Sequence, residues 1–400
     1  MQIIVQRAGA YLKISENANC GFERIPTTRS QQWLYLLGAG GVVYSEARHH
    51  FAGLDAAGVA AYRAFDAGAS LRDLQQYSNA HRTVTEHPIQ ILDELHAIHA
   101  LARGIFPDGD VSADWPLLDT SVGVARGTIN IEIHGIPIAI DYPKESLEYL
   151  CLDYLQNCVP TTQPARCHLS VQSTPDGWAI IVNGCRFFSL QQKEQVGLGL
   201  MHAIRSLLYA EGEYDIAFHA AMVAHQNCGV MLCAPREYGK STLAAHLVAQ
   251  GFDLLTDEPA LLNLDTGSVV PLRLPISLKE GSWPSVLQEW PKLAETPIHI
   301  RSDGVKIRLA HAPAARSGDR PRRLTHIVFP QYSPDSHAVV EPLLPLHTLR
   351  LLNEGGMLLA RHLARDSFEA FLKLICETPA YKFRYTSIED IKQLVTALRA

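Results

Sequence analysis

In the second half of the chain, short apolar runs typical of strands are followed, after one loop, by apolar residues at helical spacing. Residues 229–233 are a short apolar run of the kind that forms a buried strand. Residues 242–250 repeat apolar side chains at helical spacing, and Gly251 marks the expected end of that helix. Residues 218–224 are also largely apolar and residues 225–228 have a turn composition, so together they predict a hairpin with the following strand. We therefore expect a hairpin that leads through a loop into a helix.

The loop itself has the spacing of a phosphate-binding loop. Four residues separate Ala234 from the run Gly239, Lys240 and Ser241, as in the G-x-x-x-x-G-K-[ST] pattern, with alanine in place of the first glycine. Alanine is acceptable there if its φ is negative. Loop N–H groups, the helix dipole and the Lys240 charge would all attract an anion, and Ser241 would offer Mg²⁺ a hydroxyl. The motif predicts phosphate contacts from Ala234, Tyr238, Gly239, Lys240, Ser241 and Thr242.

Two adjacent carboxylates follow the next predicted strand. Asp257 and Glu258 come directly after residues 252–256, where the acidic residue of a phosphate-transfer site belongs. One carboxylate could hold Mg²⁺ together with Ser241, and the other could take a proton from a substrate hydroxyl. Further along, Lys279 is a candidate cation for neutralising a phosphate group.

The order of His219, the loop and the paired acids resembles the catalytic core of the HPr kinase/phosphorylase family. The runs at residues 275–279, 326–330 and 381–385 resemble those of HPr-kinase-related proteins, and the likeness covers about residues 119–400. The resemblance implies a P-loop core related to phosphoenolpyruvate carboxykinase. It also implies ATP- and Mg²⁺-dependent phosphorylation of a hydroxyl group.

The same resemblance implies roles for three residues of this chain. Asp257 would be the general base, Glu258 a metal-binding or orienting group, and His219 a contact to the transferred phosphoryl group. The family commonly has Asp where Glu258 stands, so the division of labour within the acidic pair stays open. The family also has glycine and small residues where this chain has residues 236–238.

The first hundred residues alternate strand-like runs with helical spacing. Strands are predicted over residues 3–5, 11–14, 33–37 and 41–44, and helices over residues 55–65, 71–77 and 89–103. Strands followed by three helices are typical of a winged helix. The spacing between residues 41 and 74 resembles the PqqD-like domain, which binds the leader of a ribosomally made peptide as an added strand. A purely structural winged-helix extension is the alternative.

These patterns predict an α/β protein of three domains. We expect a PqqD-like winged-helix domain over residues 1–105, an α/β accessory lobe over residues 119–215 and a P-loop kinase core with C-terminal helices over residues 216–400. A linker rich in turn-forming residues is expected at residues 106–110. The accessory lobe shows no chemical motif of its own, so it would brace the core or help to form the substrate cleft.

Composition narrows the classes of partner. The 400 residues are 47% hydrophobic and 19% charged, as in ordinary globular proteins, and the net charge of −6 at pH 7 argues against a nucleic-acid partner. No apolar stretch reaches the roughly twenty residues that span a membrane, and the first residues lack a signal-peptide pattern. We therefore expect a cytoplasmic protein. Eight cysteines without a C-x-x-C pair indicate neither a disulfide framework nor a zinc site.

The sequence as a whole predicts an ATP- and Mg²⁺-dependent serine/threonine kinase that acts on a ribosomally made precursor peptide. Three alternatives stay open. A small-metabolite kinase would leave the N-terminal domain unexplained. A kinase/phosphorylase acting on an HPr-like carrier would need a docking surface and a homo-oligomer. A non-catalytic, nucleotide-switched peptide chaperone is favoured by the altered loop.

Overall fold

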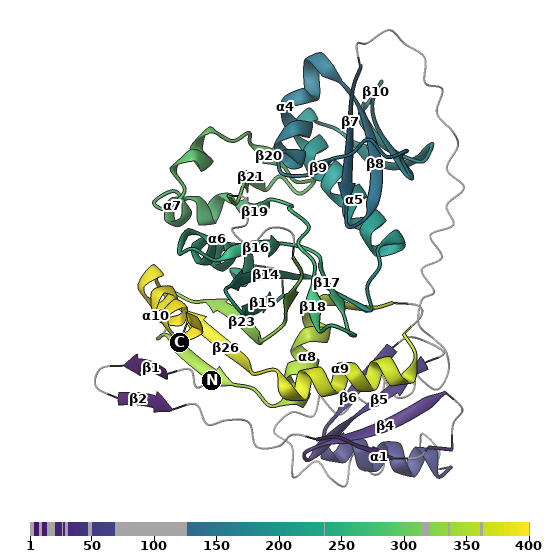
Figure 1. Cartoon of the computed structure of the whole chain (residues 1–400), viewed down its shortest axis with the longest axis vertical. Coiled ribbons are helices and arrows are strands. Elements are labelled where there is room, and N and C mark those ends of the chain that lie inside the picture. Colours follow the sequence, from purple (N-terminus) through teal and green to yellow (C-terminus); the bar gives the residue numbers. More distant parts are fainter. Residues whose placement is uncertain are drawn as a thin grey trace.

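The chain forms a mixed α/β structure with several sheets (Figure 1). The computed structural model describes residues 4–7, 10–13, 21–25, 27–28, 31–46, 50–68, 126–235, 237–313, 320–334, 337–360 and 363–399. The helices expected over residues 71–77 and 89–103, the linker at residues 106–110 and Arg236 lie outside the described residues.

A six-stranded sheet in the order β16-β14-β15-β23-β26-β24 leads into the 234–239 loop. Its strands are β14 (Ala220–His225), β15 (Cys228–Cys233), β16 (Asp253–Thr256), β23 (His326–Tyr332), β24 (Val339–Pro342) and β26 (Ala380–Tyr385). β14 and β15 are antiparallel, with Ala220 opposite Cys233, whereas β15 and β23 run parallel. The predicted hairpin is therefore confirmed.

Both faces of this sheet are covered by helices. The helices are α6 (Lys240–Ala249), α8 (Pro345–Gly356), α9 (Arg365–Glu377) and α10 (Ile388–Arg399). From β14, Ala221 and Val223 pack in one hydrophobic cluster with α6 and α10, while Met222 belongs to the cluster that includes α8 and α9. Because successive side chains of a strand point to opposite faces, a strand buried on both sides reads as a continuous apolar run.

A second sheet has the order β22-β18-β17-β13-β25. Its strands are β13 (Ile216–Phe218), β17 (Ala260–Asn263), β18 (Ser268–Val269), β22 (Arg322–Arg323) and β25 (Met357–Leu359). β17 and β18 form a hairpin, and the second strand ends at Val269. Pro271 has no backbone donor and Arg273 has a φ of 54°, so the ladder stops there.

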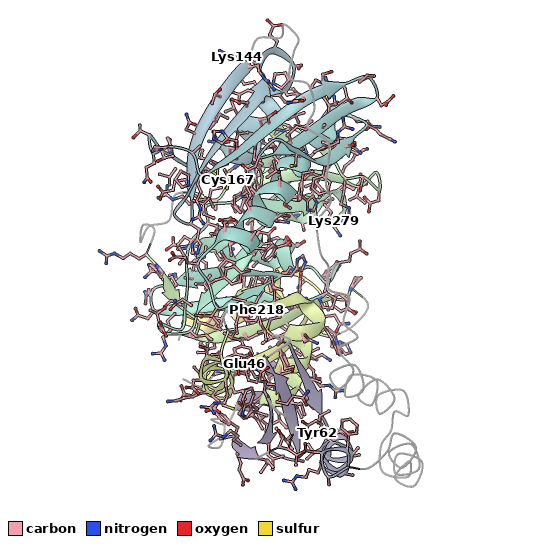
Figure 2. The ribbon with its side chains drawn as sticks, turned by 90° about the vertical axis from the view of Figure 1, so that its right-hand side faces the viewer. Glu46, Tyr62, Lys144, Cys167, Phe218 and Lys279 are labelled. Carbon is pink, nitrogen blue, oxygen red and sulfur yellow. The ribbon has the colours of Figure 1, made fainter. Side chains whose placement is uncertain are left out.

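The accessory lobe is a third sheet, in the order β12-β11-β10-β8-β7-β9, against which two helices pack. Its elements are β7 (Arg126–Ile133), β8 (Ile136–Pro143), α4 (Lys144–Leu155), β9 (Val159–Pro160), β10 (Cys167–Thr174), β11 (Gly177–Val182), β12 (Cys185–Leu190) and α5 (Val196–Glu211). The sequence does not predict β12. Figure 2 shows Lys144 of this lobe near the end of the molecule opposite Tyr62, with Cys167 between them.

A small sheet, β19-β21-β20, lies between the lobe and α6 (Figure 1). It comprises β19 (Ile276–Lys279), β20 (His299–Ile300) and β21 (Lys306–Ala310), with the short helix α7 (Trp283–Val286) between β19 and β20. Ile276 and Leu278 pack in the same cluster as α6, and His299 Nε2 lies 2.7 Å from Asp153 Oδ2 of α4. The small sheet is therefore fixed to both neighbours.

The described N-terminal part is a four-stranded antiparallel sheet with one helix. Its elements are β3 (Glu23–Ile25), β4 (Gln32–Leu37), β5 (Gly40–Ser45), β6 (His50–Leu54) and α1 (Ala56–Asp66), while β1 (Ile4–Arg7) and β2 (Ala10–Lys13) pair separately. β1, β2, β4, β5 and α1 confirm the predicted elements, and β3 and β6 were not predicted from the sequence. Asp55 caps α1 by accepting the N–H of Gly58 at 2.7 Å.

One face of this N-terminal sheet shares a hydrophobic core with the C-terminal helices. The Tyr44 and Phe368 rings stack with centroids 4.0 Å apart, and the Tyr44 hydroxyl donates a 2.7 Å hydrogen bond to the Leu363 carbonyl. Tyr35 and Phe51 belong to the same cluster. The described N-terminal residues therefore do not have a core of their own on that face.

Candidate active site

A pocket of about 800 Å³ opens at the N-terminus of α6, where the lobe, the acidic pair and the small sheet meet. This volume lies within the range of about 300 to 1,000 Å³ that small-molecule sites usually have. Eight of the predicted site residues line it: His219, Gly239, Lys240, Ser241, Thr242, Asp257, Glu258 and Lys279. The other two do not: Ala234 is buried and Tyr238 is exposed.

Among the described residues of the 234–239 loop, two have a positive φ. Gly239, with a φ of 86°, is the N-cap of α6, and Glu237 has a φ of 74°. Ala234 does not have a positive φ, so an alanine is unstrained at the position where the motif has glycine. The hydroxyl of Tyr385, at the end of β26, donates a 3.2 Å hydrogen bond to the Gly239 carbonyl. The N–H groups of the first turn of α6 are thereby presented at the pocket.

Lys240 is a buried cation at the start of α6. Its side chain is 8% exposed, and Nζ donates a 2.7 Å hydrogen bond to the backbone carbonyl of His219. Burial lowers the pKa of Lys240, although the charges of Asp257 and Glu258 partly oppose this. A phosphate group would offer the same ammonium stronger, charged acceptors.

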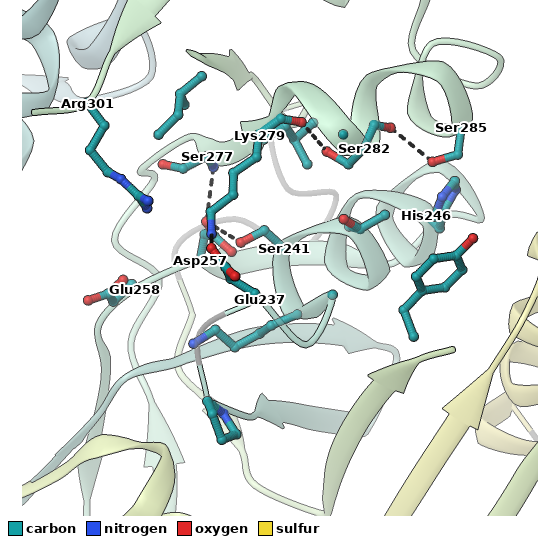
Figure 3. A pocket seen from close by; sticks show the side chains of 18 of the residues that line it. Glu237, Ser241, His246, Asp257, Glu258, Ser277, Lys279, Ser282, Ser285 and Arg301 are labelled. Carbon is teal, nitrogen blue, oxygen red and sulfur yellow. Dashed lines mark hydrogen bonds and ion pairs between the residues drawn. The ribbon is translucent and has the colours of Figure 1, made fainter. Parts of the chain in front are cut away.

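Asp257 lies at the inner end of the pocket, 3% exposed. Its Oδ2 accepts the Ser241 hydroxyl at 3.1 Å and the Ser277 N–H at 3.0 Å (Figure 3). Its Oδ1 is buried and has no hydrogen-bond partner among the described residues. Burial raises the pKa of Asp257 above its usual value, despite these two donors and the nearby charges of Arg205 and Lys240. One carboxylate oxygen is therefore available to a ligand.

Glu258 has both carboxylate oxygens engaged. Oε1 lies 2.6 Å from His219 Nδ1, and Oε2 lies 3.0 Å from Nη1 of Arg205. Burial alone would raise the pKa of Glu258, but the Arg205 charge, together with the hydrogen bond and charge of His219, holds it at about 2. An ionised carboxylate only accepts hydrogen bonds, so it fixes the proton of His219 on Nδ1.

Arg205, which lies in α5 of the accessory lobe, is a site residue that the motifs do not reveal. It lines the pocket with its helix neighbours Met201 and His202. The lobe therefore contributes to the cleft, which is one of the two roles expected for it. A signal was present in the sequence: the 16 residues of α5 are largely apolar, and Arg205 is buried within them. A buried arginine needs a charged partner, but the sequence does not identify Glu258 as that partner.

Ion pairs also form at the outer part of the pocket. Lys279 Nζ lies 3.0 Å from Glu237 Oε1, which ties β19 to the 234–239 loop (Figure 3). Arg301, after β20, donates from Nε to Asp303 Oδ1 at 2.8 Å. The predicted phosphate contact Lys279 thus reaches the pocket, with a carboxylate of the loop as its present partner.

Ser241 and Asp257 have the chemistry of a partial magnesium site. The described residues include no group of three or more His, Cys, Asp or Glu side chains that could enclose a metal ion. Magnesium that accompanies a nucleotide usually takes only one or two carboxylates and completes its shell with phosphate oxygens and water. The Ser241 hydroxyl and Oδ2 of Asp257, which lie 3.1 Å apart, fit an ion of that kind.

Comparison with known proteins does not assign this chain to a family. A scan against protein-family models gives no match, and a search of curated proteins finds no similar sequence. The resemblance to HPr kinases and to PqqD-like domains thus stays a prediction. Within the described ranges, no helix has the length and apolar character needed to cross a membrane.

Proposed function

We propose that this protein is an ATP- and Mg²⁺-dependent kinase of the HPr-kinase-like type, which phosphorylates a serine or threonine hydroxyl of a ribosomally made precursor peptide. The observation that carries the proposal is the 3.1 Å hydrogen bond between Ser241 and Asp257 at the N-terminus of α6. P-loop enzymes use a loop serine and an acid from a neighbouring strand together, and here the predicted pair is in direct contact.

The phosphates would bind at the start of α6. The first-turn N–H groups and the helix dipole attract anions there, and Lys240 supplies a full positive charge. On binding, the Lys240 ammonium would exchange the carbonyl of His219 for phosphate oxygens. Lys279 would likewise exchange Glu237 for phosphate.

The acceptor proton would go to Asp257. Its Oδ1 has no hydrogen-bond partner among the described residues, whereas both oxygens of Glu258 are held by His219 and Arg205. A general base must have an oxygen free to reach the proton, so the geometry favours Asp257. Glu258 would then orient His219 next to the phosphoryl group.

Ser241 and Oδ2 of Asp257 would hold Mg²⁺. When bound, the ion would neutralise negative charge on the β- and γ-phosphates. The protein's own contribution is to hold the hydroxyl of Ser241 against the buried carboxylate of Asp257.

The N-terminal sheet supports a peptide as the substrate. In the described part of the chain, β3 and β6 are its outer strands, and an outer strand offers backbone donors and acceptors to an extended peptide. Binding a leader there would keep the modified segment close to the kinase core, because the sheet packs on α8 and α9.

Mass spectrometry of candidate peptides tests this proposal. Short peptides encoded beside the gene are incubated with the protein, ATP and Mg²⁺, each with and without its leader segment. We expect the mass of one phosphate on a serine or threonine of the full-length peptide and a higher KM for the leaderless form. Phosphorylation of a small metabolite with no peptide modified would favour the metabolite kinase instead.

A further inference from the structure

Arg205 is a buried cation that the accessory lobe contributes to the pocket. Its side chain is 9% exposed, and its Nη1 lies 3.0 Å from Glu258 Oε2. Its Nε is buried and has no hydrogen-bond partner among the described residues. Burial alone would lower the pKa of Arg205, but Glu258 together with the nearby Tyr154, Asp257 and Tyr209 outweighs burial and raises it, so the side chain stays charged.

This contact leaves part of the guanidinium unsatisfied. A guanidinium carries five N–H donors in a planar fork, and here the buried Nε–H has no acceptor among the described residues. Removing such a group from water has a large free-energy cost unless further acceptors compensate. Stability alone does not require the pair, because apolar residues of similar volume serve a protein core as well. The missing acceptors are those of an anion with several oxygens.

The location of Arg205 indicates which anion that is. Arg205, Lys240, Asp257 and Glu258 all line the same pocket, and both cations interact electrostatically with the two carboxylates. Phosphates held by Lys240 and Ser241 at the start of α6 would extend towards this pair. The terminal phosphate would then meet Arg205 on the side of the accessory lobe.

We infer that Arg205 is a catalytic residue that binds the equatorial oxygens of the phosphoryl group during its transfer. This inference rests on the proposed kinase function. In the transfer, the acceptor hydroxyl oxygen forms a bond to the γ-phosphorus, and the bond to the bridging oxygen breaks. The electron pair of that bond leaves with ADP, and the hydroxyl proton passes to Asp257. Arg205 exchanges neither protons nor electrons. It stabilises the negative charge on the equatorial oxygens of the phosphoryl group during the transfer.

Calorimetric titration of Mg-ADP, with and without aluminium fluoride, tests this role without requiring the acceptor. Aluminium fluoride mimics the phosphoryl group during its transfer. A residue that contacts that group should therefore affect the affinity for Mg-ADP only when aluminium fluoride is present. For Arg205→Met we expect the affinity for Mg-ADP alone to stay within about twofold of wild type. The factor by which aluminium fluoride raises that affinity should fall about 10²- to 10³-fold. Arg205→Lys should lose less, because it keeps the charge but not the planar fork.

Two further variants separate this role from a structural one. Arg166→Met, in the same lobe, removes an exposed arginine that pairs with Glu211 of α5, and should leave both arms unchanged. The double variant Arg205→Met with Glu258→Gln tests whether Arg205 only neutralises Glu258. We expect the double variant to stay defective; recovery of the tightening would overturn the inference.

The remaining outcomes are also decisive. A wild type that binds no Mg-ADP would overturn the proposed function, and the inference with it. A wild type that binds Mg-ADP, but shows no tightening or the same tightening as Arg205→Met, would overturn the inference alone. If Arg205→Met does not fold, Arg205→Lys carries the test, and a lysine variant with undiminished tightening would count against the inference.

Discussion

Replacing Gly239 by alanine would test the geometry at the start of α6. Gly239 has a φ of 86°, and this left-handed conformation costs a residue with a Cβ about 1–2 kcal/mol. The added Cβ would also overlap the hydroxyl oxygen of Tyr385. That hydroxyl would have to move and lose its 3.2 Å hydrogen bond to the Gly239 carbonyl, which is worth about 1 kcal/mol. We expect the free energy of unfolding to fall by about 2–3 kcal/mol in total.

Urea denaturation of a double-mutant cycle separates the two contributions. Tyr385→Phe alone should cost about 1 kcal/mol, since it removes only the hydrogen bond. In the double variant, Gly239→Ala no longer meets the hydroxyl, so the double variant should be no less stable than Gly239→Ala alone. The two single losses should therefore exceed the double loss by about 1 kcal/mol or more.

Gly135, in the turn between β7 and β8, provides a matched control. It has a φ of 73°, and a Cβ there would meet nothing within 4 Å. Gly135→Ala should show the backbone strain alone, and its loss should add to that of Tyr385→Phe. Additivity of Gly239→Ala and Tyr385→Phe to within about 0.5 kcal/mol, or a Gly239→Ala loss no larger than that of Gly135→Ala, would show that the Tyr385 hydroxyl does not constrain this position.

Three further variants test other parts of the account. Lys240→Ala should weaken Mg-ADP binding about 10- to 100-fold in calorimetry, because a charge-assisted hydrogen bond to phosphate is lost; unchanged affinity would mean that the phosphates bind elsewhere. Ser241→Ala should abolish the dependence of ADP affinity on Mg²⁺, measured by titration with and without EDTA, whereas a retained dependence would place the metal at other ligands. Phe368→Ala should lower stability by about 3–5 kcal/mol in a single unfolding transition, because its ring joins the N-terminal sheet to α9; two separate transitions in calorimetry would show that the two parts unfold independently.

The chain around the loop is predictable because its signals are local. The hairpin of β14 and β15 follows from two apolar runs and a turn, and α6 follows from helical spacing between the Gly-Lys-Ser run and Gly251. The strand β16 ends directly before Asp257, as expected. Each of these features depends on residues that are neighbours in sequence, where propensity and periodicity carry information.

Features that depend on packing between distant segments were not predictable in the same way. The contact of Arg205 with Glu258 requires α5 to pack beside the acidic pair, and no spacing in the sequence encodes this. The shared core of the N-terminal sheet had a partial signal: Leu34 and Tyr35 of β4 are adjacent and both apolar, so both faces of the strand needed cover. One face is covered by α1, but the partner of the other face is more than 300 residues away in sequence, at Phe368.

The most direct test of a phosphate-transfer site is the fate of ATP in wild type and in Asp257→Asn. ATP binding, ADP formation and the peptide mass are followed in the same samples with Mg²⁺. We expect both proteins to bind ATP, and only the wild type to form ADP together with one phosphate on the peptide. If Asp257→Asn keeps the full peptide-related activity, or the wild type binds ATP without transferring phosphate to any peptide or metabolite tested, the pocket is a nucleotide switch and the kinase account is wrong.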